Sequence, residues 1–277
     1  MPGSYCPFHQ RTCTETGLLY GDRRYEIGIA MARLSGGWQM RNPVTVWRQE
    51  VGAIVANALD VPEECRPPFS EPITLEAYAL LRDSEAATSG LEEIGRVIGA
   101  PSVLVDLLID PTPDVRPTLG RWTTHHQAIS QQFSRFDGSK EERRRTALRR
   151  FWNENISWVR DAARELNHPI TDLPMFSDSE LRRAIDTMPM LRYLSAVFVG
   201  RFLDSNRRWH ENDLTDMAFL ACAAGHVDYV VGEAGTGAQL QQIQRSLRKP
   251  PSVFTKLAPL VERLTEDGVR TASEKLT

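Results

Sequence analysis

The densest group of residues that could do chemistry lies in the stretch NDLTDMAFLACAAGHVDYVVGEAGTGAQL, residues 212–240. Asp213 and Asp216 stand at the start of an apolar run that predicts a helix. They are three residues apart, so they share one face of its first turn. Glu233 follows in a glycine-rich loop. Carboxylate oxygens are the ligands that Mg²⁺ and Mn²⁺ prefer, so this stretch is the first candidate for a metal site.

Each of these acids also has a simpler interpretation as a helix cap. A carboxylate in the first turn accepts hydrogen bonds from free backbone N–H groups and complements the positive end of the helix. Asn212 and Asp213 are both suitable N-cap residues. Two acids on one face, with further acids downstream, favour a shared site, and capping stays the alternative.

The helix, strand and loop expected around these acids would bring them close together. We expect a helix over residues 212–224 and a short β-branched strand over 227–231. In α/β folds, ligands bind beyond the carboxyl ends of parallel strands, and Glu233 falls just past that end. Asp228, at the opposite end, is expected to be a structural partner. His226 is expected to be a turn residue or a hydrogen-bond partner rather than a general base.

The glycines after this strand are a weak signal for phosphate binding. Gly232, Gly235 and Gly237 lie between a strand and a helix, where backbone N–H groups can cradle a phosphate. The loop lacks the Lys-Ser/Thr pair of a Walker loop and a full G-x-G-x-x-G. It is expected to tolerate an RNA phosphate near a metal, rather than to define a nucleotide-binding domain.

Composition places the chain among soluble globular proteins. It has 277 residues, 41% hydrophobic and 25% charged, with a net charge of -3, so any contact with nucleic acid must be local. Cys6, His9 and Cys13 lack the second half of a zinc site. No secretory signal is visible, and the most apolar window, residues 191–203, is interrupted by two arginines. We therefore expect a cytoplasmic protein with no membrane contact.

The pattern along the chain predicts an α/β fold that is predominantly helical, with a small parallel sheet flanked by helices. We expect an irregular arm at residues 1–23, a single domain over 24–264 and a frayed tail at 265–277. Helices are expected at the following ranges, with a proline-rich hinge at 110–117: 24–34, 43–60, 73–82, 91–109, 118–166 and 178–204. Residues 38–41 are expected to form a short strand, and 253–264 a final strand or helix.

Two blocks of the sequence resemble bacterial PIN-like domain proteins. The first is N-D-L-x-D, an apolar helix and H-V-D-Y-V-V-G-E, which is similar to the C-terminal part of that family. The second, over residues 24–51, is a helix, a short strand, Asn-Pro and a helix that carries Glu50. The similarity covers scattered blocks between about residues 24 and 247. It implies a PIN-like domain with a helical insertion at about 118–204.

The resemblance also implies an activity. PIN domains are metal-dependent ribonucleases, and many are toxins of toxin–antitoxin pairs. By position, the resemblance implies that Glu50, Asp213, Asp216 and Glu233 hold Mg²⁺ or Mn²⁺, which activates water for attack on an RNA phosphodiester. An antitoxin or another protein could then be a partner.

Two departures from the family keep alternatives open. The family's domain opens with an apolar strand that ends in an Asp, and Asp22 is a poor match for that residue. Glu233 stands where the family usually has Asp. A catalytically degenerate PIN-like binding or regulatory module is therefore the second hypothesis. A mostly helical protein unrelated to nucleases, in which the acids are caps and surface charges, is the third.

Arginines near these acids could position a phosphate. Arg207 and Arg208 lie a few residues before the acidic helix. The run at residues 143–150 could bind an RNA backbone, with Trp152 or Trp158 stacking on bases. Because glutamates are interspersed with these arginines, we favour a solvated helix face balanced by i,i+4 pairs.

Overall fold

The computed structural model describes residues 38–74, 119–169, 175–210 and 213–269, together with Glu26, Ile27, Ile29, Ala30 and Ser35. Several expected features lie outside these residues. They are the N-terminal arm with its cysteines, Asp22, the helix at 91–109 and the hinge at 110–117.

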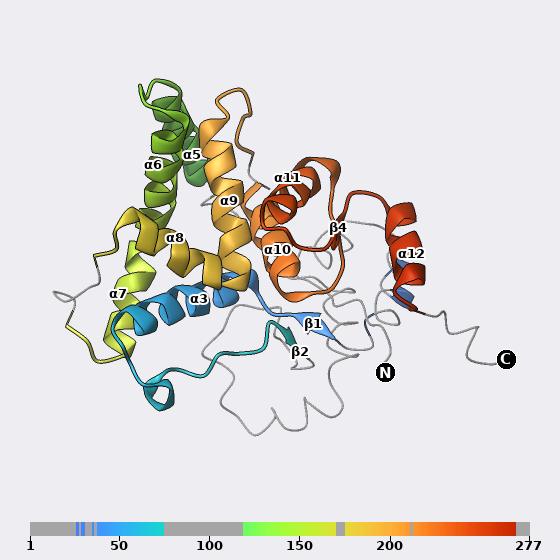
Figure 1. The fold of residues 1–277 in the computed structure, drawn as a ribbon, viewed down its shortest axis with the longest axis horizontal. Coiled ribbons are helices and arrows are strands. Elements are labelled where there is room, and N and C mark those ends of the chain that lie inside the picture. The colour runs from blue at the N-terminus through green and yellow to red at the C-terminus, as the bar shows by residue number, and fades with distance from the viewer. Residues whose placement is uncertain are drawn as a thin grey trace.

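The described part of the chain is predominantly helical, which confirms the coarse expectation for its fold (Figure 1). Its α-helices are α3 (Pro43–Ala58), α5 (Leu119–Ser134), α6 (Lys140–Glu154), α7 (Ile156–Glu165), α8 (Asp178–Thr187), α9 (Pro189–Leu203), α10 (Asp213–His226), α11 (Ala234–Ser246) and α12 (Leu257–Glu266). A short 3-10 helix covers Glu63–Cys65. No described helix combines the length and the apolar character that crossing a membrane requires.

Helix α9 lies at the centre of the molecule. It packs against α10, α6, α5, α8, α11 and α3. Figure 1 shows it with α5 and α6 on one side and α10 and α11 on the other. Its side chains are apolar on almost every side, as expected for a helix covered all round. Aromatic rings from α3, α5, α6 and α9 gather along it, with Trp47 and Phe198 among them.

Helix starts follow the local sequence closely. Asn42 caps α3 by accepting from the backbone N–H of Val44 at 2.9 Å, and Pro43 takes the first helical position as expected. Capping boxes open α6 and α8. The single helical stretch expected over 178–204 is divided, because Pro189 begins α9 and Met188 before it is extended. Helix α10 continues through His226, two residues beyond the expected end.

The strands form two small pairs. β1 (Gln39–Met40) pairs antiparallel with β2 (Ile73–Thr74), where a helix over 73–82 was expected to begin. β3 (Val230–Val231) pairs in parallel with β4 (Val253–Phe254), with Val230 opposite Val253. Helix α11 connects β3 to β4, so this region is a β-α-β unit, the connection that parallel strands require. The expected strand at 227–231 is thus shortened to its last two residues.

Candidate functional site

Glu50, one of the four predicted metal ligands, caps a helix. It lies on α3 and is 0% exposed. Its Oε1 accepts from the backbone N–H of Met190 at 2.8 Å, and its Oε2 accepts from that of Leu191 at 2.7 Å. These N–H groups belong to the first turn of α9, whose first residue, Pro189, has none. The carboxylate therefore stabilises the positive end of α9 from a different helix.

His226 completes this arrangement. It is the last residue of α10, and its Nε2 lies 3.2 Å from Oε1 of Glu50. Of the two roles expected for His226, the structure shows the hydrogen-bond partner. One turn earlier, burial and the nearby Glu50 carboxylate raise the pKa of the Cys222 thiol. A protonated thiol in such a place is a small buried hydrophobe.

Asp213 is paired with a buried arginine. Its Oδ2 accepts from the backbone N–H of His210 at 2.7 Å and contacts the guanidinium of Arg201. Arg201 is 1% exposed, its guanidinium lies 4.6 Å from the ring centre of Trp209, and it also donates to the carbonyl of Arg208 at 2.9 Å. Burial lowers the pKa of Arg201, and the charge of Asp213 opposes that shift. A side-chain cation thus occupies the position beside Asp213.

Glu50 and Asp213 lie at opposite ends of α10. Glu50 contacts the last residue of that helix, and Asp213 is the first. Thirteen residues at 1.5 Å each separate the two ends by about 20 Å, whereas bonds to a hard cation are about 2–2.6 Å long. One cation cannot be held by both residues, which corrects the expected four-carboxylate site. Within the described ranges, no group of three or more His, Cys, Asp or Glu could hold a metal ion.

Asp216 lies on the face of α10 that meets the loop before Glu233. Asp216, which is buried, and Leu220 are four residues apart and share one face of α10. The methyl carbons of Leu220 lie 3.4 Å from the position that a Cβ would take at Gly232, the residue before Glu233. The face of α10 that carries Asp216 is therefore directed at the loop between β3 and α11.

Arg207 also reaches this loop. A Cβ at Gly235, in the first turn of α11, would lie 3.2 Å from Nη2 of Arg207. Glu233 is the N-cap residue of α11, and its exposed carboxylate lies 3.4 Å from the hydroxyl of Thr236. The side chain of Arg208 is exposed, and its backbone carbonyl accepts the hydrogen bond from Arg201. Arg207 and Glu233 therefore both lie near the start of α11, just beyond β3.

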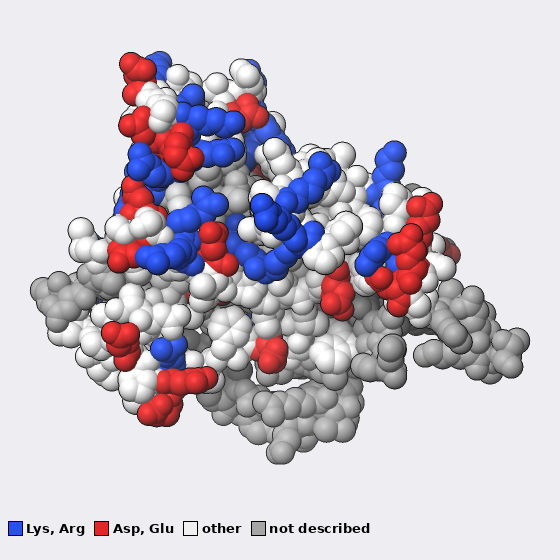
Figure 2. Space-filling model, viewed as in Figure 1, with Lys and Arg blue, Asp and Glu red and all other residues white. Residues whose placement is uncertain are grey.

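The strongest concentration of cations lies elsewhere, in a concave surface that we call the basic groove. It has a volume of about 810 Å³ and is lined by residues of α6, α8, α9 and α11. Its cationic lining residues are Lys140, Arg143, Arg144, Arg182 and Arg192. Figure 2 shows Lys and Arg side chains across the middle of this face, where Figure 1 places these helices.

The charge of the basic groove is poorly balanced by acids. Asp186 is the one carboxylate among the lining residues, and it pairs with Arg182 at 3.0 Å. Among the described residues, Lys140, Arg144 and Arg192 have no ion-pair partner. Partial burial, and then the charge of Arg192, lower the pKa of Lys249 in the turn after α11. These features give the groove an excess of positive charge.

The preferred interpretation of the arginine run at 143–150 holds for Arg150, which forms an i,i+4 pair with Glu154 at 2.8 Å. Arg149 is also balanced, but by Asp178 of α8 at 2.5 Å. Arg143 and Arg144, in contrast, line the basic groove.

The tryptophans near this run do not line the groove: Trp152 is buried, and Trp158 is partly exposed at another surface. Trp152 lies edge-on to Phe176, and Trp158 lies edge-on to Trp47. Arg182, Arg192 and the glutamines of α11 were missed from the sequence, because four separate helices bring them together and no local pattern marks them.

No family model matches the chain, and comparisons with curated proteins and with solved structures find no match either.

Proposed function

We propose that the protein is an RNA-binding module whose basic groove holds the phosphate backbone. The observation that carries this proposal is the gathering of five cations and a single carboxylate in one concave surface. The whole chain has a net charge of -3, so this excess is local. Neutralising phosphates with Lys and Arg releases counterions from a nucleic acid, which supplies much of its affinity for such a surface.

The shape and the polar lining of the groove favour RNA over a flat anionic surface. A concave surface admits a nucleic-acid backbone, whereas a membrane would touch only its rim. The lining includes four uncharged polar side chains, Ser195, Gln239, Gln242 and Ser246. Amides and hydroxyls can bond the ribose 2′-OH, which distinguishes RNA from DNA. The described lining residues include no aromatic side chain, so we expect contacts to phosphate and sugar rather than base stacking.

The proposal assigns the acids of the expected metal site chiefly to stability. Glu50 caps α9, and Asp213 pairs with Arg201. This use of the two positions, about 20 Å apart, is what the third hypothesis expects, a mostly helical protein in which the acids are caps and surface charges. The catalytically degenerate PIN-like module is also compatible with it. The PIN-like fold itself is part of the proposal, and the parallel unit of β3, α11 and β4 supports it. An antitoxin partner and a cytoplasmic location remain predictions.

A metal-dependent ribonuclease is the second candidate. It is favoured by the position of Glu233 just beyond β3, with Arg207 close to Gly235 in the first turn of α11 and the face of Asp216 directed at the same loop. Asp216 and Glu233 would then be the candidate ligands for Mg²⁺ or Mn²⁺, without Glu50 and without Asp213, which is paired with Arg201. A metal held there would supply an activated water, and Arg207 would orient a phosphate.

RNA binding is tested by fluorescence anisotropy with a structured RNA and a single-stranded RNA over a range of salt concentrations. We expect binding that weakens with salt. In the double variant Arg144→Gln/Arg192→Gln, affinity should fall at least about tenfold, and the salt slope by about 2, one for each lost phosphate contact. The matched control is Arg121→Gln/Arg160→Gln, whose exposed arginines lie outside the groove. Equal losses in the two doubles, or no binding at low salt, would contradict the proposal.

The nuclease candidate is tested with the same RNAs and Mn²⁺. Glu233 is exposed, so Glu233→Gln should leave the fold intact. Metal-dependent cleavage by the wild type that is lost in Glu233→Gln would support the nuclease. Binding without cleavage would support the binding module.

A further inference from the structure

Helix α12 carries an aliphatic face that the described part of the chain leaves open. Leu257 and Val261 lie four residues apart on one side of the helix, and they are 68% and 58% exposed. No residue of α12 is buried, and the helix packs against β4. Aliphatic side chains that stand together in water are covered favourably when a partner binds. This face is therefore a candidate interaction surface.

Acidic side chains lie beside this aliphatic face. Glu262 and Glu266 are exposed and four residues apart, so they share the side of the helix next to Val261. Glu262 has no ion-pair partner among the described residues, and Glu266 lies 3.6 Å from Arg263. Figure 2 shows acids gathered over α12, on the same face of the molecule as the Lys and Arg side chains of the basic groove. The exposed surface of α12 is thus both acidic and aliphatic.

The basic groove is aliphatic as well as cationic. Its aliphatic lining residues include Leu148, Ala196, Val199, Leu203, Ile243 and Leu247. The three from α9 recur every three or four residues, so they form one strip along that helix, which we call the α9 strip. Helix α9 lies between α6 and α11 (Figure 1), and nothing lies within 4 Å of a Cβ added at Gly200, beside the strip. An RNA backbone has no aliphatic group to cover the α9 strip, whereas a protein helix has.

The dimensions of α12 agree with those of the groove. A helix about 10 Å across takes up about 420 Å³ per turn, so the groove volume of about 810 Å³ corresponds to about two turns of helix. The α9 strip, from Ala196 to Leu203, is also about two turns long, at about 1.5 Å per residue. The ten residues of α12 make about three turns. The side of α12 that carries Leu257 and Val261 can therefore lie along the whole strip.

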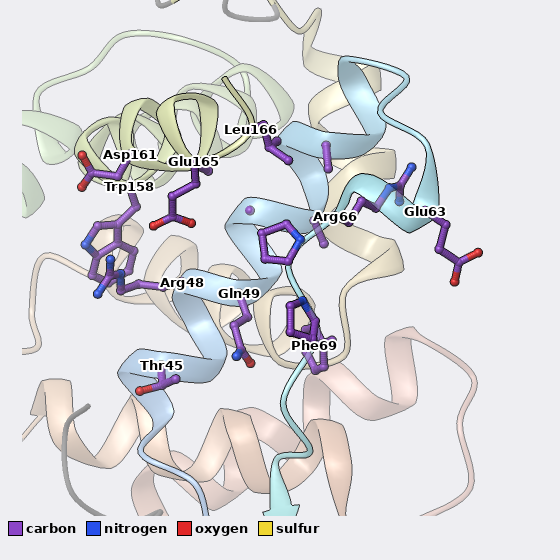
Figure 3. Close-up of a pocket in the computed structure, with 16 residues that line it drawn as sticks. Thr45, Arg48, Gln49, Glu63, Arg66, Phe69, Trp158, Asp161, Glu165 and Leu166 are labelled. Atoms are coloured by element: carbon purple, nitrogen blue, oxygen red, sulfur yellow. The ribbon is translucent and has the colours of Figure 1, made fainter. Parts of the chain in front are cut away.

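A second cavity complements α12 less well. It has a volume of about 580 Å³ and lies between α3, α7 and the segment that follows the 3-10 helix (Figure 3). Its charged lining residues are three acids and two arginines: Glu63, Asp161, Glu165, Arg48 and Arg66. The guanidinium of Arg66 is engaged by the carbonyl of Val61 and the side chain of Asn57. The acids of α12 would meet other acids in this cavity, whereas the basic groove offers them cations.

We propose that α12 of one copy of the chain docks in the basic groove of a second copy. Leu257 and Val261 cover the α9 strip, and Glu262 faces the cations of the groove. Both surfaces lie on the face shown in Figure 2, so two copies placed face to face make the contact twice and form a closed dimer. The proposal goes beyond RNA binding and does not rest on it. Because RNA and α12 would share the groove, the dimer is a form of the protein that does not bind RNA.

The test is sedimentation velocity of the full chain, without RNA, at concentrations from about 1 to 500 µM. Contacts through one short helix are small, and small interfaces give weak complexes, so we expect a reversible dimer with a Kd of about 1–100 µM. A chain that stays monomeric at about 500 µM would overturn the proposal. A dimer in a chain that binds no RNA would support it and contradict the proposed function. A monomer that binds RNA would do the reverse.

Variants on α12 test one side of the contact. Leu257→Gln/Val261→Thr removes the aliphatic face of α12, and its control is Ile156→Gln/Val231→Thr, at two positions that are each 39% exposed and lie outside the groove. We expect the Kd of the dimer to rise at least about tenfold in the α12 variant and to stay unchanged in the control. Glu262→Lys, at an exposed position that does not affect folding, should also weaken the dimer. Equal dimerisation in the α12 variant and its control would overturn the proposal.

Variants in the groove test the other side. Val199→Thr/Leu203→Gln makes the α9 strip polar, and its control is Val44→Thr/Leu59→Gln, at half-buried positions outside the groove. We again expect a Kd at least about tenfold higher in the groove variant only, with thermal unfolding of the two doubles alike. A dimer that is lost in the α12 variant but persists in the groove variant would show that α12 binds another surface, and would overturn the proposal.

Discussion

Arg201 and Asp213 form an ion pair in which the guanidinium is 1% exposed and the carboxylate 16% exposed. Trp209 covers one face of the guanidinium, with its ring centre 4.6 Å away. The acid that the sequence offered first as a metal ligand is therefore already beside a cation that the chain supplies. Removal of one member of such a pair leaves the other buried and unpaired, which is a strongly destabilising change.

The first prediction concerns this pair. Asp213→Asn keeps an oxygen that can accept from the N–H of His210 but removes the charge opposite Arg201. We expect the free energy of unfolding to fall by about 3–5 kcal/mol, the usual cost of breaking a buried pair. Urea denaturation followed by circular dichroism measures it.

The control for Asp213→Asn is Asp161→Asn. Asp161 pairs with Arg164 at 2.6 Å, but both side chains are well exposed, at 42% and 59%. A pair of this kind contributes at most about 1 kcal/mol. If Asp213→Asn cost no more than Asp161→Asn, the pair with Arg201 would not be a structural element, and Asp213 would again be available as a metal ligand.

The second prediction concerns Glu50. Its two oxygens each accept from a backbone N–H of α9. In Glu50→Gln, one of these oxygens becomes an NH₂ group that faces another donor, and the charge at the helix end is lost. We expect a loss of about 3 kcal/mol in the free energy of unfolding. Guanidinium denaturation measures it, with the exposed Glu262→Gln as control.

The opposite result would point back to a metal site. Functional carboxylates that face no protein partner are often destabilising, so their removal leaves stability unchanged or increases it. An increase in the stability of Glu50→Gln would therefore contradict its role as a cap.

Features set by neighbouring residues could be predicted from the sequence. The helical character, the start of α3 at Pro43 and the strand before Gly232 all depend on local conformational preferences and on hydrophobic periodicity. The acids at the start of α10 were placed correctly for the same reason. The sequence could not decide whether Asp213 is a helix cap or a metal ligand, because its partner Arg201 lies on another helix.

Features formed by distant parts of the chain could not be predicted. The partners of Glu50 are 140 and 141 residues away, and no pattern around Glu50 indicates which helix it will meet. A buried Glu at the edge of an apolar face fits a cap and a metal ligand equally well. The basic groove raises the same difficulty, since Arg144 and Arg192 look like ordinary surface residues until α6 and α9 are placed side by side.

The third prediction uses two glycines in helices. A Cβ at Gly225 in α10 would lie 2.6 Å from the backbone of Pro189, at the end of α9 that Glu50 caps. Gly225→Ala must push the two helices apart, and we expect it to cost at least about 1–3 kcal/mol, as overpacking does. At Gly200, in α9, nothing lies within 4 Å of the added Cβ. Gly200→Ala should therefore stabilise by about 0.5–1 kcal/mol through helix propensity. Thermal unfolding of the two variants should shift in opposite directions. A shift of the same sign in both would mean that α9 and α10 do not approach closely at Gly225.

The last prediction is a dependence of stability on pH that arises at His126. This residue is 3% exposed, and its Nδ1 lies 2.9 Å from the carbonyl of Trp122. Burial lowers the pKa of its imidazole below the usual 6.5, against the smaller opposing effects of that carbonyl and of Glu154. Because the unfolded chain then binds a proton more readily than the folded one, stability is fully present above pH 6.5. It is lost as the pH falls from 6.5 through the folded pKa.

The loss at His126 can be at most about 1.4 kcal/mol per pH unit. Urea denaturation at pH 7.5 and 5.5 measures it for the wild type and for His126→Phe, which keeps a ring in the aromatic cluster but cannot be protonated. We expect the variant to lose less stability than the wild type between these pH values. His125→Gln, at an exposed neighbouring position, should keep the wild-type difference. An identical pH dependence in His126→Phe and the wild type would show that the imidazole is protonated as easily in the folded chain as in the unfolded one.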